Sequence, residues 1–168
     1  MFNKIDKLSE TEFTQVFSNV FENAGWISKK LYGQKPFKNF QDLSKKMISI
    51  FENANNEDKL KILNAHPDLA DKTKIGSLSP DSNEEQNNAG LDQCTEKEFN
   101  QFKILNSKYK NKFGFPFILA VKGRQKSEIL LNFEKRVLSD QKTEFNEGIV
   151  QVIQIANLRL KELKNKFL

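Results

Sequence analysis

The sequence predicts an all-α fold, a single domain of about seven to nine helices spanning residues 1–168. Apolar residues recur at three- and four-residue spacing along most of the chain, the pattern of helices with one buried face. Three Ser/Thr-x-x-Glu patterns, typical of helix starts, precede such segments. The one strand-like segment, Phe115 to Val121, contains Pro116 and has no partner strand in the sequence. We therefore expect an extended connector there.

Three helices are expected in the first half of the chain. The first begins at the capping box of Ser9 and Glu12, and its apolar face is formed by Phe13, Val16, Phe17, Val20 and Phe21. The second follows the break from Gly33 to Pro36 and carries Phe40, Leu43, Met47, Ile50, Phe51 and Ala54. A short third helix, Leu60 to Asn64, is expected to stop at His66, because Pro67 disfavours the α conformation in the residue before it. Residues 71–81 have no sustained period and are predicted to form a long loop.

The second half of the chain is predicted to contain further helices. Ser82 with Glu85 forms a second capping-box pattern, and Thr95 with Glu98 a third. The helix after Thr95 carries Phe99, Phe102, Leu105 and Tyr109 on one side. The next is marked by Ile129, Leu130, Phe133 and Val137. A long final helix carries Phe145, Val152, Ala156, Leu160 and Leu163.

The charge and hydropathy of the sequence indicate which classes of binding partner to expect. The 27 basic and 22 acidic side chains give a net charge of +5, spread along the chain without a Lys/Arg block. This balance suits a small anionic substrate, and the phenylalanines fall on core faces, so we do not expect nucleic-acid binding. No apolar window approaches the roughly 18 residues of a membrane span, and no secretory signal is present. We therefore expect a cytoplasmic protein without a membrane partner.

The sequence does not suggest a metal or a coenzyme. The lone Cys94 excludes an internal disulfide, and one Cys with one His cannot supply a conventional zinc site. No phosphate loop or dinucleotide fingerprint occurs. We expect chemistry that uses ordinary side chains, with no cofactor.

Three residues are candidates for that chemistry. His66, the only histidine, is either a proton-transfer group or a helix-terminal residue satisfied by backbone groups. Glu85 is either a functional carboxylate or the third residue of a capping box. Arg159 shares the apolar face of Val152, Ala156 and Leu163, so it either pairs with a structural carboxylate, reaches the rim, or binds an anion.

Several motifs together resemble one family. They are His66-Pro67-Asp68-Leu69-Ala70, the segments Ser82 to Leu91, Leu105 to Tyr109 and Phe113 to Ile118, the segment Phe21 to Trp26, and Ile155 to Leu160. With matching spacing along the chain, they resemble 2-oxo-4-hydroxy-4-carboxy-5-ureidoimidazoline (OHCU) decarboxylases, which form (S)-allantoin in urate degradation. The match extends over nearly the whole chain. Asn23-Ala24-Gly25 departs from the family's His-Ser-Pro, which leaves the details of that turn open.

The resemblance implies an all-helical, cofactor-free carboxy-lyase, often a homodimer, that acts on a small anionic ureidoimidazoline. It implies that His66 and Glu85 are catalytic. The substrate-contacting positions that it implies are Pro67, Ser82, Asn83, Glu84, Gln86, Phe117, Ile118, Leu119, Ala120, Val121 and Arg159. The alternatives are a lyase or hydrolase for another small ureido or imide anion, and a non-catalytic helical binding module.

Overall fold

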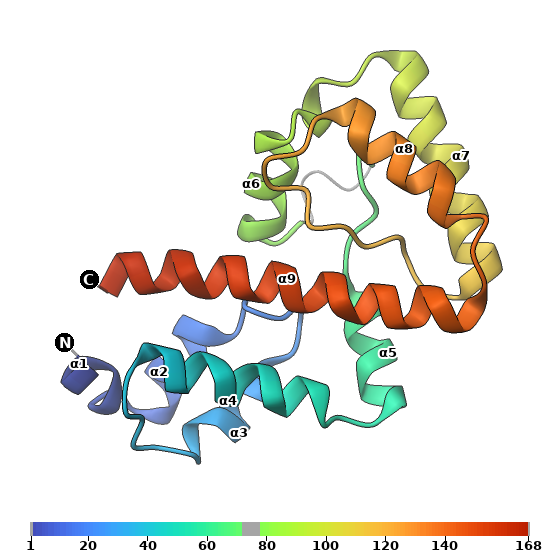
Figure 1. Ribbon diagram of the computed structural model, residues 1–168. Helices are drawn as coiled ribbons and strands as arrows, with labels where there is room; N and C mark the ends of the chain where they lie inside the picture. The colour runs from blue at the N-terminus through green and yellow to red at the C-terminus, as the bar shows by residue number, and fades with distance from the viewer. Residues whose placement is uncertain (1, 72–77, 168) are drawn as a thin grey trace. The chain divides into compact units, whose positions relative to one another are not determined.

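The computed structural model describes residues 2–71 and 78–167, which form helices and contain no β-strand (Figure 1). The elements are α1 (Phe2–Asp6), α2 (Glu10–Phe17), α3 (Gly25–Tyr32), α4 (Phe40–Glu52), α5 (Asn56–Ala65), α6 (Pro80–Asn88), the 3-10 helix η2 (Leu91–Gln93), α7 (Glu96–Phe113), α8 (Lys126–Arg136) and α9 (Gln141–Phe167). The all-α prediction is confirmed. No described helix combines the length and the apolar character that a membrane crossing requires.

The chain divides into two compact units. Unit 1 contains the residues up to Ile62 and those from Ile153 onward, and unit 2 contains Leu63–Val152. Helices α5 and α9 each contribute residues to both units. The single-domain organisation of the chain stays a prediction.

In unit 1, the predicted helix after Ser9 is shorter than its apolar pattern suggested. Ser9 and Glu12 form the expected capping box, but α2 ends at Phe17. Val20 and Phe21 lie in the following turn and are nevertheless buried. The prediction of one helical face through Phe21 was wrong, because a turn can bury apolar side chains at the same spacing as a helix.

The core of unit 1 is built around phenylalanines. Helix α3 packs against both α2 and α4. The rings of Phe13 and Phe17 have centroids 4.6 Å apart, and those of Phe21 and Phe51 are 4.9 Å apart. Helix α3 was not predicted, since its N-cap, Ala24, makes no side-chain capping bond and provides no start signal.

In unit 2, the predicted capping box of Ser82 and Glu85 is wrong. Helix α6 starts earlier, with Ser79 as N-cap and Pro80 as its first residue. The backbone N–H of Ser82 donates to Ser79 Oγ at 3.2 Å. Pro80 suits this position because the first helical residue needs no N–H partner within the helix. The predicted loop is therefore shorter than residues 71–81, and its residues 72–77 lie outside the described ranges.

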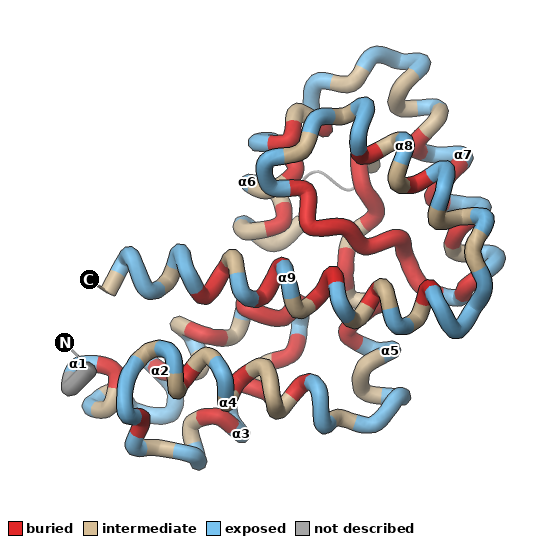
Figure 2. Tube along the Cα trace, in the orientation of Figure 1, coloured by how far each residue is buried: buried red, intermediate tan, exposed pale blue. Residues whose placement is uncertain are grey.

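The core of unit 2 surrounds Tyr109 of α7. This ring lies 4.5 Å from that of Phe113, 5.5 Å from that of Phe117 and 6.0 Å from that of Phe133, measured between centroids. The connector between α7 and α8 is extended, as predicted, and all its residues from Phe115 to Val121 are buried. Figure 2 shows this connector as a continuous buried stretch.

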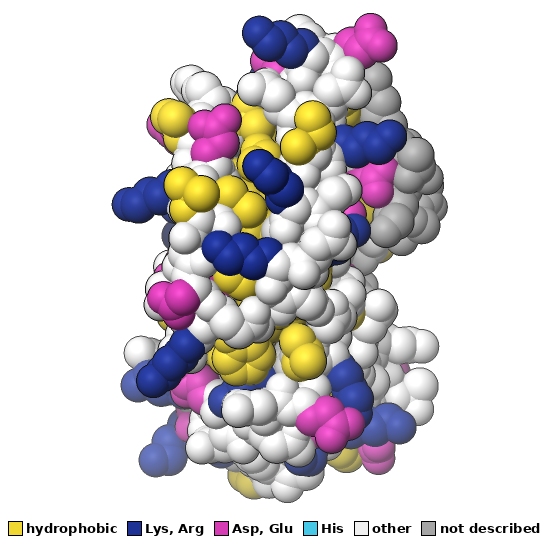
Figure 3. Space-filling model, turned by 90° about the vertical axis from the view of Figure 1, so that its right-hand side faces the viewer, with side chains coloured by type: hydrophobic (Ala, Val, Ile, Leu, Met, Phe, Trp, Pro, Cys, Tyr) yellow, Lys and Arg dark blue, Asp and Glu magenta, His cyan; other side chains and the backbone are white. Residues whose placement is uncertain are grey.

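Basic and acidic side chains alternate on the one face of the molecule that Figure 3 shows. On the face in Figure 3, lysine and arginine side chains are spread from one end to the other, with acidic side chains between them. This agrees with the scattered charge of the sequence and provides no basic block on that face.

Candidate active site

The only histidine lies on a buried turn. Helix α5 ends at Ala65, and His66 follows it directly, as its position before Pro67 predicted. His66 is 8% exposed, and its backbone N–H donates to the carbonyl of Leu63 at 3.2 Å. The histidine is thus buried at the end of α5, and its backbone is bonded to the last turn of that helix.

The chain after His66 is held by Gln86 of α6. Gln86 Nε2 donates to the carbonyl of Asp68 at 3.3 Å, and Gln86 Oε1 accepts from the backbone N–H of Ala70 at 3.0 Å. Ala70 has a φ of 54°, a conformation that costs energy for a residue with a Cβ. The two bonds from one amide hold the chain in this strained turn.

Helix α7 holds the same turn from two further residues. Asn106 Nδ2 donates to the carbonyl of Leu69 at 3.0 Å. Lys110 Nζ lies 2.6 Å from Asp68 Oδ2, and the Asp68 side chain is only 10% exposed. Gln86 and Asn106 therefore bond to the backbone that immediately follows His66 and Pro67, and Lys110 holds the Asp68 side chain of the same turn.

The predicted residues of α6 are arranged on different sides of the helix. Ser82 and Gln86 are buried, Asn83 and Glu85 are half-buried, and Glu84 is exposed. Glu85 is the sixth residue of α6 and so is not the third residue of a capping box. The capping explanation for this glutamate does not apply.

The connector's predicted substrate-contacting residues are enclosed by the core of unit 2. Phe117 stacks on Phe133, with ring centroids 3.9 Å apart. The backbone N–H of Ala120 donates to Gln151 Oε1 at 2.9 Å. This amide therefore already has a partner within the protein.

Arg159 belongs to unit 1 and points inward, as its place on the apolar face of α9 predicted. It is 4% exposed, its Nη2 lies 2.9 Å from Glu22 Oε1, and its Nη1 donates to the carbonyl of Asn19 at 2.8 Å. The guanidinium thus pairs with a buried carboxylate, one of the alternatives that the sequence left open. Its role in substrate binding stays a prediction.

Sequence reasoning gave no role to Glu22, Asn106 or Lys110. Their partners lie 137, 37 and 42 residues away along the chain. Local periodicity carries no information on such pairs. In the two described ranges, no three His, Cys, Asp or Glu side chains are grouped as a metal site would require.

A buried histidine at the end of α5, followed by a turn that side chains of α6 and α7 hold, defines a small α-helical protein with a polar, histidine-centred candidate site. The model of the OHCU decarboxylase family matches residues 6–161. The chain belongs to the OHCU decarboxylase family.

Named relatives agree with this assignment. A 2-oxo-4-hydroxy-4-carboxy-5-ureidoimidazoline decarboxylase from Halalkalicoccus jeotgali is 33% identical over 95% of this chain and 89% of its own. One from Xenopus laevis is 33% identical over 96% and 93%, respectively. A uric acid degradation bifunctional protein from Bacillus sp. (strain TB-90) is 38% identical over 95% of this chain, which spans only 31% of that relative. A similar Bacillus subtilis protein is matched over 32% of its length.

Two solved structures share the fold. One, described as (S)-allantoin synthase, superposes with a TM-score of 0.78 and 24% identity over 97% of this chain and 53% of its own. The other, OHCU decarboxylase in the presence of (S)-allantoin, has a TM-score of 0.69 and 22% identity over 86% of this chain and 94% of its own.

Proposed function

We propose that this protein decarboxylates OHCU to (S)-allantoin without a cofactor. The observation that carries the proposal is the single histidine, buried on a turn that α6 and α7 hold at three points, in a chain of the OHCU decarboxylase family. The decarboxylase relatives that this chain matches over most of their length support the same reaction.

The substrate supplies its own electron sink. Its ring has a C=N bond next to the carbon that bears the carboxylate. When carbon dioxide departs, the electron pair left behind forms a C=C bond to the neighbouring carbon, and the C=N electrons move onto the ring nitrogen, which takes up a proton. The adjacent hydroxyl loses its proton as it becomes the ring carbonyl, and the neighbouring carbon gains a proton on one face. The protein therefore has to bind the ring and manage protons.

His66 performs the proton transfer in this proposal, because it is the only histidine of the sequence and an imidazole exchanges protons near neutral pH. Glu85 orients or polarises His66, or holds the ureido group. The half-buried position of Glu85 within α6, where capping does not account for it, supports a functional role. Ser82 positions the ring, together with the contacts implied for Pro67, Asn83, Glu84 and the backbone of the Phe117–Val121 connector.

Gln86 acts indirectly in this proposal. Both ends of its amide are bonded to the turn that carries His66, so it positions the catalytic residue. Arg159 fixes an anionic or carbonyl oxygen of the substrate, as the family resemblance implies. We also propose that the protein forms a homodimer and is located in the cytoplasm. Light scattering of the purified protein tests whether it is a dimer.

The handedness of the product tests the reaction. OHCU is generated freshly by the upstream enzymes, and the circular dichroism of the allantoin formed is followed with and without this protein. Spontaneous decay gives a racemate, so we expect an optical signal of the (S) form only when the protein is present. A racemic product at an unaltered rate would refute the proposed function.

A further inference from the structure

Backbone groups of the connector between α7 and α8 form hydrogen bonds with side chains, whereas those of a β-strand would pair with a neighbouring strand. It is extended and buried from Phe115 to Val121, and buried backbone groups require hydrogen-bond partners. The carbonyl of Ile118 accepts from Arg136 Nη1 at 2.7 Å, and the N–H of Ala120 donates to Gln151 at 2.9 Å. The carbonyl of Ala120 accepts from Arg124 Nε at 3.0 Å. The path of the connector is therefore set by side chains.

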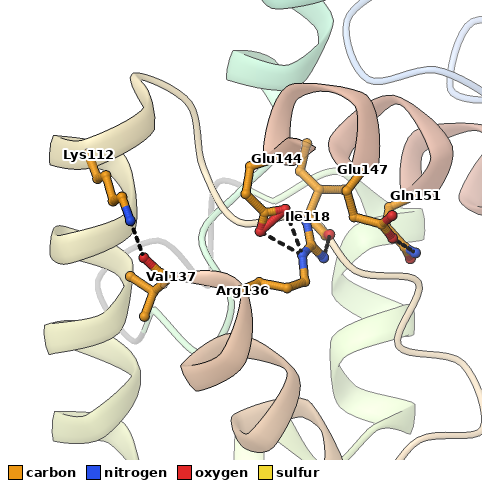
Figure 4. A network of polar contacts seen from close by, with 7 residues as sticks. All are labelled: Lys112, Ile118, Arg136, Val137, Glu144, Glu147 and Gln151. Atoms are coloured by element: carbon orange, nitrogen blue, oxygen red, sulfur yellow. Dashed lines mark hydrogen bonds and ion pairs between the residues drawn. The ribbon is translucent and has the colours of Figure 1, made fainter. Parts of the chain in front are cut away.

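Arg136 lies at the centre of this arrangement (Figure 4). Its Nε donates to both carboxylate oxygens of Glu144, at 3.0 and 3.2 Å. Its guanidinium also lies over the ring of Phe117, 4.4 Å from the ring centroid. One side chain thus contacts the connector through a backbone carbonyl and through an aromatic ring, and is itself held by α9.

Burying the ion pair of Arg136 and Glu144 costs desolvation free energy, which the attraction between the two charges offsets only in part. The Arg136 side chain is 11% exposed and that of Glu144 only 1%. Burial raises the pKa of Glu144, and Arg136 acts in the opposite direction. Replacing a buried ion pair by apolar residues is often neutral or stabilising, so stability alone is a weak reason for this pair. What the pair provides that apolar residues lack is a directed bond to the connector backbone.

Gln151, like Arg136, is oriented by a glutamate of α9. Its Nε2 donates to Glu147 Oε1 at 2.8 Å (Figure 4). Its Oε1 accepts from the N–H of Ala120 at 2.9 Å. The connector is thus held at a carbonyl by α8 and at an N–H two residues later by α9.

We propose that Arg136 and Gln151 are positioning residues, which hold the backbone of the Phe117–Val121 connector in place for the substrate. The inference rests on the proposed function, which gives this segment its contact with the substrate. A shift of about 1 Å in a substrate-positioning group can lower the rate of an enzyme up to roughly a hundredfold.

The test removes the pair without leaving a buried charge. In the double variant Arg136→Met/Glu144→Leu, we expect a folded protein with a modestly lower melting temperature, because no buried charge remains but the Ile118 carbonyl loses its bond to Arg136. We expect kcat/KM to fall about tenfold or more, mainly through a higher KM. Hydrogen exchange of the connector amides should become faster. Gln151→Met, which keeps the ion pair, should change exchange and KM in the same direction.

Lys112→Met is the matched control. Lys112 Nζ donates to the carbonyl of Val137, next to Arg136, and within the described parts of the chain it forms no hydrogen bond to the connector (Figure 4). This variant should leave both kcat/KM and connector exchange unchanged. The inference requires that kcat/KM falls and connector exchange becomes faster in each folded variant. It is overturned if either variant changes only one of these two measurements, or neither of them. Absence of wild-type activity would refute the proposed function instead, and connector exchange would then decide separately whether these side chains hold the backbone.

Discussion

Glu85 is not the capping residue of α6. It is the sixth residue of the helix, beyond the first turn in which a carboxylate gains from the helix dipole. The N-cap hydroxyl belongs to Ser79, whose Oγ accepts from the N–H of Ser82. A half-buried carboxylate without a capping role, one residue before the glutamine that holds the histidine turn, is well placed for chemistry.

Replacing Glu85 by Gln tests this at the scale of one residue. The side chain keeps its size and loses its charge, so we expect kcat/KM to fall about a hundredfold or more while the melting temperature is unchanged. The matched control is Glu12→Gln, at the third position of the true capping box of α2, where activity should be unaffected. Wild-type kcat/KM in Glu85→Gln would show that Glu85 takes no part in the reaction.

At the scale of elements, periodicity and capping predicted most of the helices. The long amphipathic segments that became α4, α7, α8 and α9 were identified from their apolar spacing, and Thr95 with Glu98 marks the start of α7 as expected. The start of α6 was missed because Ser82 and Glu85 satisfy the same four-residue pattern as a true cap. Only the position of Pro80, together with Ser79, distinguishes the two starts.

The turn after α5 is the element on which the site depends. The end of α5 just before His66 could be predicted, since Pro67 disfavours the helical conformation in the residue before it. The bonds from Gln86, Asn106 and Lys110 could not, because they join segments 16, 37 and 42 residues apart. Bonds between residues so far apart in the sequence can be identified only from the folded structure.

Gln86→Met should weaken both the fold and the reaction. The methionine keeps the length of the side chain but leaves the Asp68 carbonyl and the Ala70 N–H without the Gln86 amide, which costs about 1–3 kcal/mol. Chemical denaturation measures this loss, and kcat/KM should fall with it because His66 is less well held. Gln141→Met, which removes a bond to the carbonyl of Phe113, is the control and should preserve kcat/KM. A fully stable Gln86→Met variant would contradict the clamp.

At the scale of the molecule, unit 1 joins the two ends of the chain. The ion pair of Arg159 and Glu22 links residues 137 positions apart, and both side chains are almost fully buried, at 4% and 6% exposure. Motif resemblance drew attention to Arg159, and its apolar helix face predicted that it points inward. Its carboxylate partner could not be predicted, because nothing in the local sequence pairs these positions.

Removing one member of this pair should destabilise the protein. Arg159→Met leaves Glu22 buried without its cation, which costs about 3–5 kcal/mol. The double variant Arg159→Met/Glu22→Leu removes both charges and should regain most of that stability, as measured by thermal unfolding. If the function implied for Arg159 is correct, the double variant folds but remains inactive. A double variant as unstable as the single one would contradict the ion-pair explanation.

The most direct test of the central claim is the turnover of freshly generated OHCU by His66→Asn. Asparagine is polar and of similar size but does not transfer protons at neutral pH, so the far-ultraviolet circular dichroism and melting temperature should match the wild type. We predict decay at the spontaneous rate and racemic allantoin. Decay near the wild-type rate, with an excess of the (S) form, would contradict a proton-transfer role for His66.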